Sequence, residues 1–157
     1  MKKFLAYSAL ILLIGISGCT PVENGNYNEG VYYGTATDNY GGESNTATAL
    51  VHVNGDGVIE SVFLDTTYTK DDVVTTKKSL GYEYGIKNVS ESMGNIPGGA
   101  EWFEQVNVLE NKVVEEQGLE WLTWSDDDKT VTDSVSGVTI KINALIEALN
   151  NALSQAK

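Results

Sequence analysis

The segment Asn54-Gly55-Asp56-Gly57 constrains the fold more than any other feature of this chain. Asn-Gly and Asp-Gly pairs favour the backbone angles of a tight hairpin, and the flanking runs 46–53 and 58–64 have the composition of β-strands. An earlier run, 30–36, is rich in aromatic and β-branched residues and is predicted to be another strand. Residues 38–45, which include two adjacent glycines, are expected to form a loop. The first half of the chain therefore predicts an antiparallel meander.

Helical periodicity is confined to the second half of the chain. In the segment 100–117 four apolar residues recur at spacings of four, three and four, which predicts a helix that Gly118 ends. The last segment has an apolar face opposite a polar one, and its apolar residues are Ile142, Leu145, Ile146, Leu149 and Leu153. Between the strands and these helices, 71–80 is expected to form a short helix and 93–99 a loop. This order predicts an α+β fold, in which helices pack on an antiparallel sheet and the chain ends in an amphipathic helix.

The N-terminus has the pattern of an export signal. Three residues with two lysines precede 13 uncharged, largely apolar residues, too few for a comfortable transmembrane helix. The following Ile16-Ser17-Gly18-Cys19 resembles the lipobox of bacterial lipoproteins, which implies cleavage before Cys19 and lipidation of that residue. An ordinary signal peptide or a membrane anchor is the alternative. We expect a signal peptide over 1–18, a lipid-anchored tether over 19–29 and one domain over 30–157.

The charge of the chain limits its partners. The formal net charge is −12, and loss of residues 1–18, which hold two lysines and no acids, leaves −14. Such a surface repels nucleic acid and anionic lipid headgroups, so attachment to the membrane falls to the lipid. Cations, basic proteins and neutral redox molecules are the expected partners. If Cys19, the only cysteine, is lipidated, disulfides and cysteine metal sites are excluded.

Residues 132–140, just before the last helix, form the motif that carries the chemistry. Asp133 and Ser136 are residue types that cap helices, and Gly137 lets the backbone approach a ligand closely. Thr139 is expected in the first turn of the helix, where free amide groups and the helix dipole favour phosphate. A capped helix without any ligand explains the same residues, so the spacing alone leaves both interpretations open.

The same motif resembles the flavinylation sequence of FMN-binding domains: Asp, any two residues, Ser or Thr, Gly, Ala, then Ser or Thr. Such domains occur in the flavin-bearing subunits of sodium-pumping NADH–quinone reductase and of Rnf complexes, and in lipoproteins of extracellular electron transfer. The resemblance implies a phosphoester between FMN and Thr139, made by a separate flavin transferase. Asp133, Ser136 and Gly137 match the recognised pattern, whereas Val138 replaces the usual alanine.

Further stretches extend the resemblance over most of 28–157. Residues 28–34 are similar to the Asp-Gly-x-Tyr-x-Gly opening of FMN-binding domains, and 77–87 and 101–105 are similar to lipoproteins called membrane immunogens. Candidates to stack on the flavin ring, which are core residues in the alternative interpretation, are Tyr82, Tyr84, Trp121 and Trp124. Trp102 belongs to an apolar helix stripe and is expected in the core.

The resulting functional hypothesis is a lipid-anchored flavoprotein that faces the outside or the periplasm. Its covalent FMN would take electrons from a membrane donor and deliver them to an extracellular acceptor, so the chain would be a carrier rather than an enzyme. No hydrolase or metalloprotease motif is present; His52 is expected on a solvent face and Asp126-Asp127-Asp128 in a solvated turn. Two alternatives stay open: a surface-binding lipoprotein or antigen without flavin, and a noncovalent binder of FMN or another small ligand.

Overall fold

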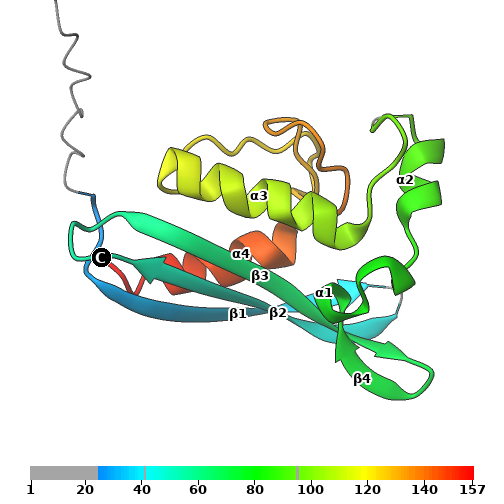
Figure 1. Ribbon diagram of the computed structural model, residues 1–157, viewed down its shortest axis with the longest axis horizontal. Coiled ribbons are helices and arrows are strands. Elements are labelled where there is room, and N and C mark those ends of the chain that lie inside the picture. Colours follow the sequence, from blue (N-terminus) through cyan, green and yellow to red (C-terminus); the bar gives the residue numbers. More distant parts are fainter. Residues whose placement is uncertain (1–24, 41, 95) are drawn as a thin grey trace, which may run out of the picture.

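Four antiparallel strands in the order β1-β2-β3-β4 form the sheet around which the chain is built (Figure 1). The computed structural model describes residues 25–40, 42–94 and 96–157. The strands are β1 (Gly30–Tyr40), β2 (Glu43–Val53), β3 (Ile59–Lys70) and β4 (Val73–Thr76). The helices are α1 (Lys77–Leu80), the 3-10 turn η1 (Gly81–Glu83), α2 (Lys87–Ser92), α3 (Trp102–Glu116) and α4 (Asn143–Leu153). The predicted α+β class, with the meander first and an amphipathic helix last, is confirmed.

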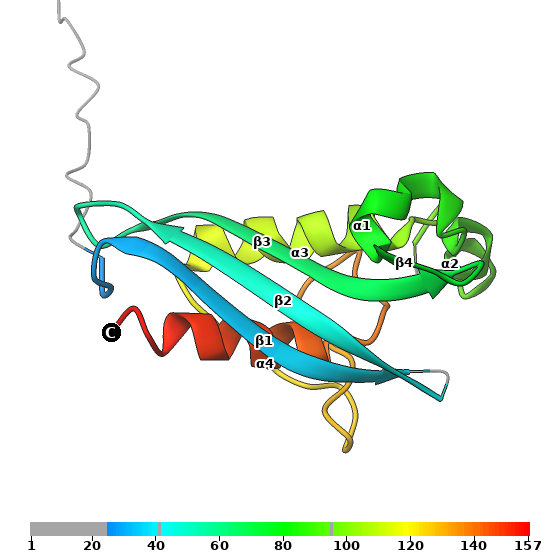
Figure 2. The same ribbon diagram turned by 90° about the horizontal axis from the view of Figure 1, so that it is seen from below.

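Both long helices cover the same face of the sheet, so that the strands lie in front of them in Figure 2. Alternate residues of a strand point to the same face. In β2 these are four fully buried residues, Ala47, Ala49, Val51 and Val53. They meet buried side chains such as Leu109 of α3 and Leu149 of α4. Helix α4 lies so close to β1 that a Cβ atom at Gly34 would stand 2.1 Å from the carbonyl oxygen of Ala148.

Helix α3 also protects an edge of the sheet. Strand β4 pairs only with residues 67–70 of β3, so the outer edge of the remainder of β3 needs other partners. The Gln117 side chain accepts a hydrogen bond from the Ile59 amide (2.7 Å) and donates one to the Ile59 carbonyl (2.9 Å). The Glu110 carboxylate accepts one from the Leu64 amide. These side chains satisfy backbone groups that would otherwise invite pairing with another chain.

Two predicted boundaries in the first half are wrong. The expected loop 38–45 is mostly strand, because β1 and β2 continue to a pairing of Tyr40 with Glu43. The expected helix 71–80 is helical only from Lys77 to Leu80. Asp71 and Asp72 take positive φ angles of 51° and 63° and make the turn between β3 and β4. Asp tolerates this conformation in a two-residue hairpin turn.

The other boundaries agree more closely with the sequence. The hairpin at 54–57 is confirmed, and β3 continues beyond the expected end of its strand. Helix α3 confirms the segment 100–117, although Gln117 rather than Gly118 takes the left-handed conformation at its end (φ 57°). Helix α2 was not expected. Within the described residues, no helix is long and apolar enough to cross a membrane.

The start of the described chain is attached to the domain. The Gly25 amide donates to the Asp56 carbonyl (2.7 Å), and the Asn28 amide donates to the Ala156 carbonyl (2.6 Å). The part of the expected tether from residue 25 onwards therefore packs beside the C-terminus. The expected signal peptide 1–18, Cys19 and residues 20–24 lie outside the described residues.

Candidate functional site

Thr139 lines a pocket of about 300 Å³ at the end of the sheet where β1 finishes. Its walls come from segments far apart in the sequence: the end of β1, α1, the η1–α2 region, α3 and the segment that leads into α4. The lining residues used below are Asp38, Tyr40, Lys77, Tyr84, Trp102, Gln105, Thr139 and Lys141. The residue that the motif predicts as the attachment point therefore faces a cavity.

Thr139 does not lie in the first turn of α4, so this prediction is wrong. The helix begins at Asn143, and Ile142 occupies the N-cap position without a side-chain hydrogen bond. The Ile142 amide donates to the Thr130 carbonyl (2.8 Å), which ties this residue to an earlier loop. Asp133 and Ser136 consequently do not cap α4. The helix dipole, which falls off within one turn, cannot be the reason for a phosphate at Thr139.

Gln105 of α3 holds Thr139 in place. Its Oε1 accepts hydrogen bonds from the Thr139 amide (2.8 Å) and from the Thr139 hydroxyl (3.2 Å). Its Nε2 donates to the Ala100 carbonyl (3.2 Å), and the side chain is fully buried. Sequence reasoning missed Gln105, although its position three residues after Trp102 and four before Leu109 puts a polar residue on the apolar stripe of the helix.

The other motif residues divide between solvent and core. Asp133 and Ser136 are exposed. Gly137 has a φ of +90°, a conformation that a residue with a side chain rarely adopts. Val138 is only 5% exposed and belongs to the hydrophobic core, and it is not among the residues that line the pocket. The two methyl groups that distinguish Val138 from alanine thus pack in the core rather than in the cavity.

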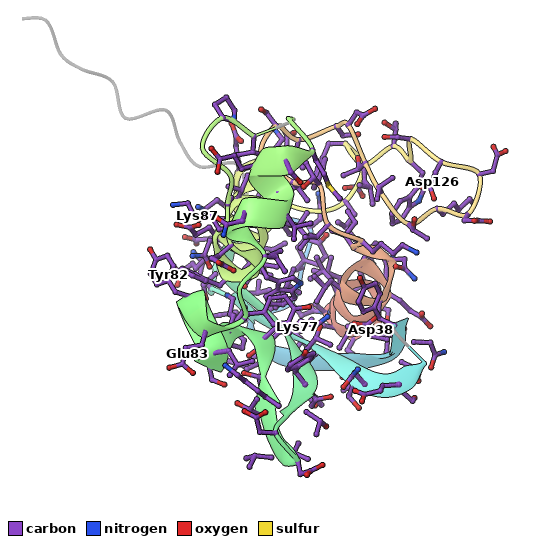
Figure 3. The ribbon with its side chains drawn as sticks, turned by 90° about the vertical axis from the view of Figure 1, so that its right-hand side faces the viewer. Asp38, Lys77, Tyr82, Glu83, Lys87 and Asp126 are labelled. Atoms are coloured by element: carbon purple, nitrogen blue, oxygen red, sulfur yellow. The ribbon has the colours of Figure 1, made fainter. Side chains whose placement is uncertain are left out.

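Lys77 brings a buried positive charge to the pocket. Its side chain is 7% exposed, and its Nζ lies 3.1 Å from Asp38 Oδ2. The same Nζ stands 5.4 Å from the ring centroid of Trp102 and 5.8 Å from those of Tyr40 and Tyr84. Figure 3 shows Lys77 beside Asp38 near the middle of this end of the molecule. Distances below about 6 Å are those of cation–π contacts.

Tyr84 is the one predicted stacking residue that lines the pocket. Its ring meets Tyr68 and Trp102 edge to face, with centroids 5.2 Å and 6.4 Å apart. Burial, followed by the charges of Tyr68, Tyr40, Asp38 and Glu101, raises the pKa of Tyr84 to about 12, so the phenol is neutral at physiological pH. Trp102, expected only in the core, is both buried and part of the pocket wall.

The remaining candidates lie elsewhere. Tyr82 is 68% exposed and contacts Phe103 edge to face, and Figure 3 shows it at the periphery. Trp121 and Trp124 are half-buried against the core and do not line the pocket. His52 is exposed beside Glu60, as expected for a strand residue on a solvent face.

The acidic run is a turn stabilised by its first carboxylate. Asp126 accepts hydrogen bonds from the amides of Thr130 (2.8 Å) and Val131 (2.9 Å) and from the Thr130 hydroxyl (2.7 Å). The bond from Val131, followed by those from Thr130, lowers the pKa of Asp126. In the part of the chain that the structure describes, no group of three or more His, Cys, Asp or Glu residues is arranged to hold a metal ion.

The lining of the pocket is compatible with a planar aromatic ligand. Its volume of about 300 Å³ is within the usual range for small-molecule sites, and aromatic walls with a few charged groups suit a planar ring with a polar edge. Thr139 offers a hydroxyl on the wall, and Lys141 lines the same pocket with an exposed side chain suited to a phosphate. Comparisons of this chain with protein-family models, with curated proteins and with solved structures found no match.

Proposed function

We propose that this chain is a lipid-anchored carrier of one FMN, attached through a phosphoester to Thr139, outside the cytoplasmic membrane. The FMN would receive electrons from a membrane donor and pass them to an extracellular acceptor. One observation carries the proposal: Thr139, the attachment residue in the motif, lines a pocket whose walls include Trp102, Tyr84 and the buried Lys77. A flavin joined to Thr139 would have an aromatic cavity within reach of its ring.

The hydrogen bonds of Thr139 are compatible with modification. A phosphoester removes the hydroxyl proton and with it the 3.2 Å hydrogen bond to Gln105. The shorter bond from the Thr139 amide to Gln105, at 2.8 Å, does not involve the hydroxyl and remains. The backbone at Thr139 would therefore keep its position after flavin attachment.

The exposure of two motif residues supports modification by a separate enzyme. Asp133 and Ser136 are on the surface, where a flavin transferase can contact them, while Val138 is buried and anchors the segment in the core. Once attached, the FMN supplies the electron chemistry, and the chain's own residues bind its ring, hold Thr139 and exclude water. A covalent bond would also prevent loss of the cofactor by dilution outside the cell.

The test is the intact mass of denatured protein, together with in-gel flavin fluorescence, after co-production with a flavin transferase and export. We expect a gain of one FMN less water on the peptide that contains Thr139. Thr139→Val, which keeps the shape of the side chain but has no hydroxyl, should abolish the gain, whereas Thr139→Ser should retain it. Flavin that leaves on denaturation would favour the noncovalent alternative.

A second function, binding of a partner by a lipoprotein without flavin, is favoured by the open face of the sheet. Tyr33, Leu50 and Phe63 lie directly opposite one another across β1, β2 and β3 and are 54%, 41% and 45% exposed. A row of exposed apolar side chains is typical of interaction surfaces. An unmodified protein, under conditions in which a related FMN-binding domain is labelled, would favour this alternative over the carrier.

A further inference from the structure

Lys77 is a buried lysine that lines the pocket. A lysine is rarely buried, because removing its ammonium group from water is unfavourable unless other groups compensate. Asp38 and three aromatic rings surround the Lys77 ammonium, whereas the neighbouring Lys78 pairs with Glu110 and does not line the pocket.

We infer that Lys77 sets the redox potential of the flavin, by holding a positive charge inside the pocket where the reduced ring carries a negative one. The inference rests on the proposed function and concerns this chain's own residue. Trp102 and Tyr84 restrict where the Lys77 side chain can move, and burial limits the screening of its charge by water. Lys77 would therefore act on a ring in the pocket without donating or accepting electrons itself.

The electron balance fixes the sign of the effect. Two electrons from a reductant such as dithionite and one proton from water convert the neutral oxidised flavin ring to a hydroquinone anion. A nearby positive charge stabilises the anion relative to the neutral ring and raises the midpoint potential. The carboxylate of Asp38, 3.1 Å from the Lys77 ammonium, opposes this effect.

The pair therefore predicts shifts of opposite sign. Lys77→Met keeps the length of the side chain, removes the positive charge and leaves Asp38 unpaired, so the potential should fall. Asp38→Asn leaves Lys77 without its counter-charge, so the potential should rise. A role confined to stability predicts no such opposition, because both variants break the same ion pair.

The experiment is a dithionite titration of each flavinylated protein at pH 7 against reference dyes, after intact mass has verified one FMN per chain. We expect Lys77→Met to disfavour the anion at least about tenfold, which for a two-electron couple lowers the potential by about 30 mV. Lys77→Arg should stay closer to the wild type than Lys77→Met. Lys78→Met is the matched control: it removes the same charge and also breaks an ion pair, and its potential should not shift.

The outcomes separate the inference from the proposed function. If the wild-type chain takes up no FMN, the proposed function fails before Lys77 is tested. If all variants carry FMN but Lys77→Met and Asp38→Asn leave the potential unchanged, or move it in the same direction, the inference is wrong and the carrier function stands. If Lys77→Met does not fold, the upward shift in Asp38→Asn decides the question.

Discussion

At the scale of single residues, the segment that contains Thr139 depends on one buried side-chain amide. Gln105 is the only side chain hydrogen-bonded to the Thr139 amide among the described contacts, and it also satisfies the Ala100 carbonyl. Both the oxygen and the nitrogen of the Gln105 amide group are therefore hydrogen-bonded, and the side chain is not exposed to water. A buried polar group that loses its partner costs more than an ordinary hydrogen bond contributes.

Gln105→Leu should therefore affect both stability and flavin attachment. Leucine fits the apolar stripe of α3 but leaves the Thr139 amide and the Ala100 carbonyl without their partner. We expect a loss of about 1–3 kcal/mol in the free energy of unfolding, measured by urea denaturation. We also expect faster hydrogen exchange at the Thr139 amide and several-fold less flavin attached by the transferase.

The control for this variant is Asn111→Leu, which makes the same kind of change at an exposed position of α3. Exposed substitutions away from such contacts usually change stability by less than about 0.5 kcal/mol. Unchanged protection of the Thr139 amide in Gln105→Leu would show that the segment is held by other contacts.

The sequence predicted which residues form the motif but not which residues hold it. Thr139 and Gly137 were identified from the motif, because its residues are adjacent in the chain. The partners of the site are distant: Gln105 is 34 residues from Thr139, and Lys77 is 39 residues from Asp38. A single sequence does not show which distant polar residues meet, so these contacts required the fold.

At the scale of whole elements, the sequence succeeded where burial imposes a regular pattern. Helices α3 and α4 were predicted because one face of each packs on the sheet and must be apolar. The prediction failed at the last residues of β1 and the first residues of β2. Both segments carry mostly exposed polar residues, so no alternation of apolar residues indicates a strand there. It also failed at 71–80, where the pair Asp71-Asp72 turns the chain sharply.

The contact between α4 and β1 predicts an effect at Gly34. This glycine belongs to the opening motif of the resemblance, and the helix backbone occupies the space that a side chain would need. Gly34→Ala should push α4 away from the sheet and cost about 1–3 kcal/mol or more, as overpacking does in cores. Thermal and urea unfolding measure the loss.

Gly55→Ala provides the comparison for this substitution. A Cβ atom at Gly55 would meet only the Glu29 carboxylate, at an ordinary distance of 3.7 Å. Its stability should therefore stay much closer to that of the wild type. Equal losses in the two variants would mean that the close approach of α4 is not the cause of the loss at Gly34.

At the scale of the whole molecule, the first described residues, from Gly25, and the pocket lie at opposite ends of the sheet. Residues 25–28 are attached beside the hairpin 54–57 and the C-terminus, near the first residue of β1 (Figure 1). The pocket uses Asp38 and Tyr40, at the last residues of the same strand. A strand rises about 3.3 Å per residue, so β1 separates these ends by roughly 30 Å. An anchor at Cys19 would join the described domain through residue 25, at the end away from the pocket.

This geometry predicts what Cys19→Ala should change. The variant has no thiol to lipidate, so the form that has lost residues 1–18 should leave the membrane fraction. Its domain, attached FMN and midpoint potential should match those of the wild type, because residue 25, through which the anchor joins the domain, is remote from the pocket. Oxidation of the reduced flavin by a soluble ferric chelate, followed by the flavin absorbance, should keep its rate. Reduction by membrane vesicles should slow at least about tenfold, because tethering raises the effective concentration of carrier beside its donor. Retention of the variant in the membrane fraction, with an intact mass that shows residues 1–18 removed, would contradict a lipid anchor at Cys19. Equal rates of reduction by the vesicles would instead mean that the donor is not in the membrane.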